Sequence, residues 1–222
     1  MSVLYTMEFK RVFDLLLKQH GPQNWWPGET SFEVMIGAIL TQNTSWTNVE
    51  KAILNLKNKK ILDPHKMLRV HNTQLAKLIR PSGYFNQKAN KLKNYLNFFK
   101  NKYGFFVQKM KKESVEKLRN ELLEVNGIGP ETADSILLYA LEKPIFVIDA
   151  YTKRIFSRLS LCRESVSYYD LQSIFMTQLP QKTSLYNEYH ALIVHHGKNI
   201  CKKSKPRCGD CSLQSMCPQT SL

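Results

Sequence analysis

A short glycine-rich turn and a lone carboxylate lie near each other in the middle of this 222-residue chain. The turn spans 126–129 (NGIG), and Pro130 after it suits the first turn of a helix, where its missing N–H costs nothing. Free N–H groups at such a helix start form a favourable site for a phosphate oxygen. Asp149 follows the apolar run 145–148. A phosphate site beside a carboxylate indicates chemistry on nucleic acid.

Four of the five cysteines fall within the last 22 residues, in the pattern C-x6-C-x2-C-x5-C. Thiolates this close in sequence can surround one soft metal centre. The spacing alone fits a four-cysteine zinc site and a [4Fe–4S] cluster equally, because tetrahedral thiolate suits both. The fifth cysteine, Cys162, is expected to be a core thiol. The candidate metal ligands are Cys201, Cys208, Cys211 and Cys217.

Basic residues fill the segment between the first two of these cysteines. Lys202, Lys203, Lys205 and Arg207 lie there with no acidic residue among them. Such a run is usually a solvated surface. A metal bound by the flanking cysteines would fix the direction of these charges, so we expect the loop to contact phosphates.

Helices must position these groups, because apolar residues recur at helical spacing along most of the chain. The run 145–148 looks strand-like but is too short to define a sheet, and an all-α fold is expected. The segment 42–46 lies between two helices and should form a rigid loop. The helix near 86–100 is expected to present a solvated basic face through Lys88, Lys91, Lys93 and Lys100. The expected helices span about 5–19, 32–40, 48–58, 64–70, 73–80, 86–100, 114–125, 131–141, 151–159, 168–178 and 184–196.

Composition sets the class of protein and of partner. A hydrophobic content of 43% fits a globular chain, and a net charge of +14 favours a polyanion such as nucleic acid. No segment approaches the ~20 apolar residues that span a bilayer. The first 20 residues form an amphipathic helix and not a signal peptide. A cytoplasmic protein without membrane contact is expected, with reduced cysteines.

Together these motifs resemble the endonuclease III superfamily of helix-hairpin-helix DNA glycosylases. The resemblance rests on the turn with Thr132 and Ala133, on Val147-Ile148-Asp149, and on the four terminal cysteines. It implies a [4Fe–4S] cluster, with zinc as the alternative. It also implies a two-lobed fold. Residues 28–142 would form a helical barrel domain with the hairpin, and 1–27 plus 143–222 a second lobe with the iron–sulfur loop (198–218).

The bifunctional members of this superfamily carry a catalytic lysine two residues beyond the second glycine of the hairpin. This chain has Glu131 at that position. A glutamate cannot form the Schiff base that drives strand cleavage, so we expect a monofunctional glycosylase without AP lyase activity. The alternative role for Glu131 is that of a helix-start acid favoured by the helix dipole.

Within the superfamily, the chain is most similar to the endonuclease III-related 3-methyladenine DNA glycosylases. The shared segments are 25–27 (WWP), 40–44 (LTQNT) with Trp46, and 80–84 (RPSGY). Some members of that subgroup have lost the cluster cysteines, whereas this chain keeps all four. A purine alkylated at N3 or N7 is already cationic, so it leaves without an acid and stacks well on an indole. Trp46, and Trp25 or Trp26, are the expected walls of its pocket, the alternative for the last two being packing under a loop.

The resemblance also assigns the remaining roles. Asp149 would stabilise the oxocarbenium-like sugar and orient the attacking water, while also capping the following helix. Gln42 would fill the space that the flipped nucleotide vacates in double-stranded DNA. A monomer associated with the nucleoid is expected. The expected DNA backbone contacts are Gly127, Ile128, Gly129, Thr132, Lys202, Lys203, Lys205 and Arg207.

Three alternatives remain at this point. A mismatch glycosylase that removes adenine or thymine would also lack the lysine. An endonuclease III-like glycosylase for pyrimidine lesions, with weak lyase activity, fits the same motifs. A noncatalytic helix-hairpin-helix DNA-binding module is the non-enzyme alternative, and it would have no need of Asp149.

Overall fold

The computed structural model describes residues 3–25 and 28–219, with the side chains of residues 3–6 left undescribed. The chain divides into two compact units. Unit 1 contains the described residues up to Trp25 and those from Pro144 onward, and unit 2 contains those from 28 to Lys143. Every element in the described part is helical or irregular.

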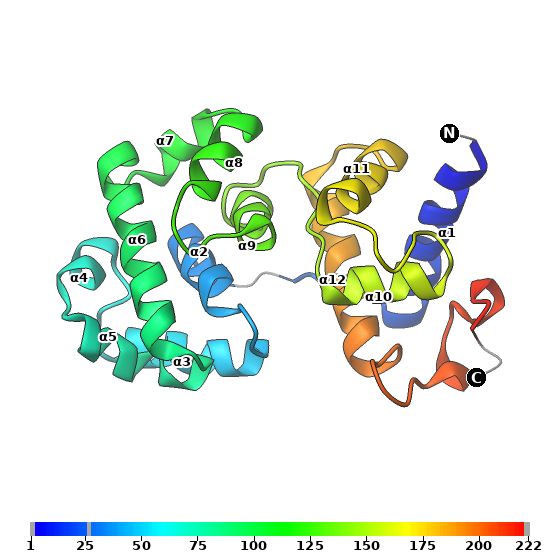
Figure 1. Cartoon of the computed structure of the whole chain (residues 1–222), viewed down its shortest axis with the longest axis horizontal. Helices are drawn as coiled ribbons and strands as arrows, with labels where there is room; N and C mark the ends of the chain where they lie inside the picture. The colour runs from blue at the N-terminus through cyan, green and yellow to red at the C-terminus, as the bar shows by residue number, and fades with distance from the viewer. Residues whose placement is uncertain (1–2, 26–27, 220–222) are drawn as a thin grey trace. The chain divides into compact units, whose positions relative to one another are not determined.

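Unit 2 is built around the buried helix α2, which packs against α3, α6, α9 and the turn η2. The long helix α6 passes α2 and carries α4 and α5 alongside it (Figure 1). Its helices are α2 (Ser31–Leu40), α3 (Trp46–Asn58), α4 (Pro64–Arg69), α5 (Asn72–Leu78), α6 (Phe85–Tyr103), α7 (Val107–Lys112), α8 (Val115–Leu123) and α9 (Pro130–Ser135). A 3-10 turn η1 (Arg80–Ser82) and a π-helical turn η2 (Ile136–Ala140) complete it.

Three helices of unit 2 start where a short polar side chain caps them. The side chain of Thr30 accepts a hydrogen bond from the backbone N–H of Glu33 at 3.1 Å. Asp63 and Ser114 do the same at α4 and α8, at 2.9 and 3.2 Å. These caps satisfy N–H groups that have no partner within the helix, so the polar sequence positions set the starts of α2, α4 and α8.

The basic face of α6 is not the solvated surface that the sequence suggests. Lys88 is 2% exposed, and its Nζ donates to the carbonyl oxygens of Leu40 at 2.8 Å and Ser82 at 2.6 Å. Burial, with the nearby Lys91 ammonium, lowers the pKa of Lys88 to about 8. Lys93 donates to three carbonyls at the end of α4. Lys100 is exposed as predicted, but the prediction was wrong for Lys88 and Lys93, because these lysines satisfy free carbonyls at helix ends, which charge patterning does not reveal.

A buried ion pair joins the two helices on either side of the glycine turn. Arg119 on α8 donates from Nε and Nη2 to the two carboxylate oxygens of Asp134 on α9, at 2.7 and 3.0 Å. Asp134 has no exposed surface. This paired geometry fixes the angle between α8 and α9, and therefore the shape of the turn that connects them.

Replacing Arg119 by methionine should lower the free energy of unfolding by about 3–5 kcal/mol, because a buried carboxylate loses its guanidinium partner. Chemical denaturation monitored by circular dichroism measures this change. Arg69→Met, at an exposed position of α4, is the matched control, with an expected change of about 0.5 kcal/mol or less. Equal effects from the two variants would contradict the structural role of the pair.

Unit 1 contains α1 (Val3–His20), α10 (Ala150–Arg158), α11 (Tyr168–Gln178) and α12 (Thr183–Asn199), followed by the turns η3 (Cys208–Asp210) and η4 (Gln214–Met216). Its core is aromatic. The rings of Phe146 and Phe175 stack at 4.0 Å, and Phe9 meets Phe175 edge-on at 4.9 Å. The expected strand-like run is an extended buried segment whose Phe146 carbonyl accepts a hydrogen bond from Gln172. It leads directly to Asp149.

Most of the predicted helices are present, with boundaries shifted by a few residues. Helix α7 was not predicted, and the helix expected at 131–141 changes from α to π geometry after Ser135. Trp46, predicted in a loop, is the first residue of α3. None of the described helices is long and apolar enough to cross a membrane.

Candidate functional site

The glycine turn leaves two backbone N–H groups available for a ligand. Gly127 has a φ of +96°, which favours glycine, and the N–H of Ile128 closes the turn by donating to Val125 O at 3.0 Å. Ile128 is therefore a structural residue whose side chain is buried, and its N–H is not free for a phosphate as the sequence suggested. In the described part of the chain, the N–H groups of Gly127 and Gly129 make no hydrogen bond. These two amides can bind an anion.

Gln42, the predicted intercalating residue, is held against this turn within unit 2. Its side-chain Nε2 donates to Gly127 O and to Thr132 Oγ1, both at 3.0 Å. Its Oε1 accepts from the Nζ of Lys91. Thr132 is 6% exposed, so its hydroxyl accepts the hydrogen bond from Gln42 in the interior of the unit and is poorly placed to contact a phosphate.

Trp46 and Glu131 also lie in unit 2. The indole of Trp46 packs over the backbone of α2, where a Cβ on Gly37 would come within 3.2 Å of the ring. Trp46 remains half-buried. Glu131 is exposed in the first turn of α9. The roles predicted for Trp46 and Glu131 therefore stay predictions.

Asp149 begins α10 in unit 1, and its two carboxylate oxygens have different surroundings. Oδ1 accepts hydrogen bonds from the Thr152 backbone N–H at 2.7 Å and from the Thr152 hydroxyl at 2.8 Å. Oδ2 lies 3.6 Å from Nε2 of His190 on α12. The side chain retains 11% of its exposure. The helix cap therefore fixes the carboxylate through Oδ1, while Oδ2 faces His190.

The surroundings of Asp149 keep it ionised. Burial raises the pKa of the carboxyl. The interaction with His190 and the two hydrogen bonds from Thr152 lower it by more than burial raises it, so the pKa of Asp149 lies below its ordinary value. An ionised, largely desolvated carboxylate is suited to stabilise a developing positive charge. His190 is 5% exposed and stacks on the indole of Trp25 at a ring separation of 6.3 Å. Trp25 thus lies one ring away from the Asp149 carboxylate, whereas Trp26 lies outside the described residues.

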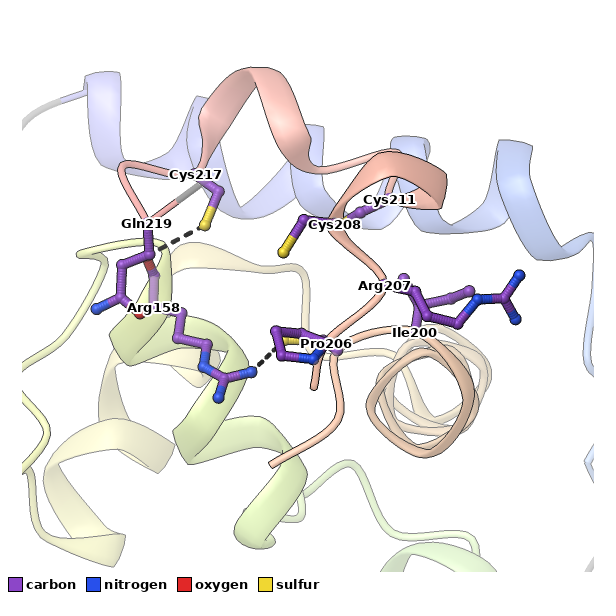
Figure 2. Close-up of a pocket in the computed structure, with 9 residues that line it drawn as sticks. Arg158, Ile200, Pro206, Arg207, Cys208, Cys211, Cys217 and Gln219 are labelled. Carbon is purple, nitrogen blue, oxygen red and sulfur yellow. Dashed lines mark hydrogen bonds between the residues drawn. The ribbon is translucent and has the colours of Figure 1, made fainter. Parts of the chain in front are cut away.

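The four candidate metal ligands line one cavity of about 330 Å³. Figure 2 shows the sulfur atoms of Cys208 and Cys217 directed toward the same space. Arg158 also lines it, and its Nη1 donates to the sulfur of Cys201 at 3.3 Å. Among the described residues, no three potential ligands are gathered closely enough to bind one metal ion. The cavity is large enough for a group of several atoms, and its soft thiol donors suit an iron–sulfur cluster.

The cysteine loop is tied to three helices of unit 1. From α10, Arg154 donates to Gly197 O and Cys201 O, and Arg158 donates to Lys202 O and Lys203 O, at 2.8–3.0 Å. From α1, Gln19 bonds the backbone of Asp210 and Ser212. From α12, Nε2 of the buried His196 lies 3.4 Å from the sulfur of Cys211.

The predicted basic surface is exposed on this loop. Lys202, Lys203 and Lys205 are all open to solvent. Arg207 is also exposed, but its guanidinium forms an ion pair with Asp210 at 2.6 Å. A phosphate would therefore have to share this guanidinium with the Asp210 carboxylate. The two carbonyls that Arg158 holds belong to Lys202 and Lys203, which fixes the backbone beneath those charges.

Several residues of the site were missed by sequence reasoning. His190 and His196 lie six residues apart on the helix before the cysteines, and that spacing places them on different turns with no recognisable metal motif. Lys91 was taken for a surface charge. Arg154 and Arg158 are four residues apart on the helix that Asp149 starts, so one helix face carries both, which was a usable signal for a basic face on this helix.

A family model described as "HhH-GPD superfamily base excision DNA repair protein" matches residues 36–181, which include the hairpin and Asp149. The chain belongs to this family. Its members are base excision repair DNA glycosylases of the endonuclease III type, and the resemblance inferred from the sequence is confirmed.

Three relatives show how this HhH-GPD protein compares with others. A Methanocaldococcus jannaschii protein named "Putative DNA repair glycosylase MJ1434" is 50% identical over 93% of this chain and 94% of its own. The solved H. pylori 3-methyladenine DNA glycosylase MagIII, bound to 1,N6-ethenoadenine, is 32% identical with a TM-score of 0.74, covering 87% of this chain and 97% of that chain. A non-covalent endonuclease III–DNA complex is 22% identical with a TM-score of 0.82, covering 96% and 95%. The predicted all-α glycosylase fold is confirmed.

Proposed function

We propose that this HhH-GPD protein is a monofunctional glycosylase that hydrolyses the N-glycosidic bond of alkylated purines in duplex DNA. The observation that carries the proposal is the ionised Asp149 carboxylate, anchored through Oδ1 by Thr152 and facing His190 Nε2 at 3.6 Å through Oδ2. Likeness to a 3-methyladenine glycosylase over most of both chains supports the substrate class.

Asp149 would act as the sugar–base bond breaks. The sugar then gains oxocarbenium character, and a fixed anion beside it lowers the barrier. Oδ2 can also accept a proton from the attacking water, because Oδ1 is already saturated by Thr152. Positioning through the cap avoids reorganisation of the carboxylate during the reaction.

The substrate base would bind against indole rings after it leaves the duplex stack. Within unit 1, Trp25 stacks on His190 beside Asp149 and is the proposed wall for the base, while Trp46 in unit 2 is the second candidate. A cationic purine gains about 0.5–2 kcal/mol from such a surface. Because its positive charge makes it a good leaving group, this substrate needs no general acid, and the described site offers Asp149 in its ionised form.

Lyase activity would require a neutral, accessible amine at the reacting sugar. Glu131 occupies the position that the family uses for this lysine. Lys88 has a lowered pKa of about 8, but it is 2% exposed and its amine is bonded to two carbonyls, so it cannot serve instead. Both observations support hydrolysis by water as the proposed reaction type.

We further propose that Cys201, Cys208, Cys211 and Cys217 hold a [4Fe–4S] cluster. Bound there, the cluster would cross-link the loop through four thiolates and fix its shape. Arg158, which lines the cavity and touches the Cys201 sulfur, would partly balance the negative charge of those thiolates.

The exposed lysines of the cysteine loop should govern the salt dependence of DNA binding. Replacing Lys202, Lys203 and Lys205 together by glutamine should weaken duplex binding at least tenfold and reduce the slope of log K against log salt by about 2–3, roughly 0.9 per lost phosphate contact. Fluorescence anisotropy across a salt series measures both quantities. The matched control is the triple glutamine variant at Lys109, Lys112 and Lys117, which are exposed on α7 and α8. Equal slopes for the two variants would exclude the cysteine loop as a phosphate-binding surface.

One experiment tests the reaction type. An end-labelled duplex with a single N7-methylguanine, a cationic alkylated purine, is incubated with the protein, with and without borohydride, and the strands are separated before and after alkali. We expect an intact abasic strand that breaks only in alkali, and no covalent adduct. Strand cleavage with a trapped adduct would show a lyase, and an uncleaved, alkali-stable strand would contradict excision of this lesion.

A further inference from the structure

One face of α6 holds both the loop after α2 and the glycine turn. Lys88, Lys91 and Asn94 are three residues apart, so their side chains project from the same side of the helix. Lys88 bonds the carbonyl of Leu40, where that loop begins, at 2.8 Å. Asn94 donates to the carbonyl of Asn126, where the turn begins, at 3.1 Å. Lys91 lies between these two anchors.

Lys91 contacts both segments at once. Its Nζ donates to Gln42 Oε1. Its aliphatic stem lies against the turn, where a Cβ added to Gly127 would come within 2.4 Å of Lys91 Cγ. The absence of a side chain at Gly127 is therefore what allows the lysine to pass along the turn.

The amide of Gln42 completes the connection. Its two N–H donors are used by Gly127 O and Thr132 Oγ1, at 3.0 Å each, and its oxygen by Lys91. A glutamine amide has two donors and one oxygen, so little of its hydrogen-bonding capacity is left in this position. The bond from the ammonium is charge-assisted and fixes which end of the amide faces the turn.

We infer that Lys91 is a positioning residue for the hairpin, acting through Gln42 to hold the Gly127 and Gly129 amides in their binding geometry. The inference rests on the proposed function, since it concerns how the hairpin grips duplex DNA. The side chain of Gln42 must break these three hydrogen bonds before it can enter the stack of DNA bases. It therefore cannot hold the glycine turn and fill the stack at the same time.

A double-mutant cycle tests this coupling. Lys91→Met keeps the stem on Gly127 and removes the ammonium, whereas Gln42→Ala removes the amide. We expect each single variant to bind undamaged duplex about tenfold more weakly, as loss of a charge-assisted hydrogen bond implies. The double variant should be no weaker than the worse single variant. Independent, multiplicative effects would overturn the inference.

Salt dependence separates positioning from direct contact. The slope of log K against log salt should stay at the wild-type value in Lys91→Met, because the lysine is bound to Gln42 and not to a phosphate. A slope reduced by about 0.9 would instead show a direct phosphate contact and overturn the inference. Lys100→Met, at an exposed position of α6, is the matched control.

Amide hydrogen exchange provides a test without DNA. The Gly127, Ile128 and Gly129 amides should exchange faster in Lys91→Met than in wild type, with the amides of α2 unchanged. Unchanged exchange at the turn would overturn the inference. If the wild type fails to bind duplex, the proposed function fails while this measurement still decides the role of Lys91.

Discussion

Asp149→Asn is expected to lower the rate of base release by about 10²- to 10⁴-fold, because the anion that stabilises the sugar is lost. Duplex affinity should change by less than about twofold. Asparagine caps helices as well as aspartate, and its oxygen can still accept from Thr152. Single-turnover excision and anisotropy measure the two quantities.

The matched control is Asp63→Asn, at the cap of α4, where the side chain makes the same kind of bond to Lys66. This variant should excise at the wild-type rate. A fully active Asp149→Asn would show that another group supplies the charge. Loss of activity in both variants would point to helix capping as the cause.

The pH dependence has a defined sign. The folded pKa of Asp149 is lowered, so its contribution to stability is present above the ordinary aspartate pKa of about 3.9 and is lost as the pH falls through the folded value. The carboxylate therefore stays ionised throughout the neutral range. We expect no loss of excision from protonation of Asp149 between about pH 5 and 8.

Cys208→Ser should remove the bound iron, because a hydroxyl is a poor ligand for soft metals. It should also weaken duplex binding about tenfold, because the cluster would no longer hold the loop that carries the lysines in a fixed conformation. Iron content, visible absorption and anisotropy measure the effects. The midpoint of thermal unfolding should also fall, since α1, α10 and α12 all bond this loop.

Cys162→Ser is the control for this prediction. Cys162 does not line the cavity, and burial raises the pKa of its thiol, so this thiol should be unreactive and should not bind the cluster. The Cys162→Ser variant should therefore retain the iron content of the wild type. Full iron in Cys208→Ser, or zinc with no iron in the wild type, would contradict the proposed cluster.

The sequence predicted the helices well because their apolar spacing and polar caps are local signals. Thr30 and Ser114 cap helices as their positions suggest. The segment after Ser135 was predicted less well, since its π-helical turn packs against α2, a contact that the local sequence does not reveal.

Side-chain partners distant in sequence could not be predicted in the same way. His190 lies 41 positions after Asp149 in the sequence, and the packing of α12 on α10 brings the two side chains together. Lys88 and Lys91 have the sequence signature of a solvated helix face, yet they hold carbonyl and amide groups of other segments. The sequence shows which charged residues share one face of a helix, but the burial of that face depends on the segments that the fold packs against it.

The most direct test of the proposed reaction is chromatography of free bases released from methylated duplex DNA. The proposal predicts that the wild type releases 3-methyladenine and that Asp149→Asn releases about a hundredth as much or less in the same time. Release of no methylated purine, with adenine or thymine freed from mismatched duplexes instead, would contradict it.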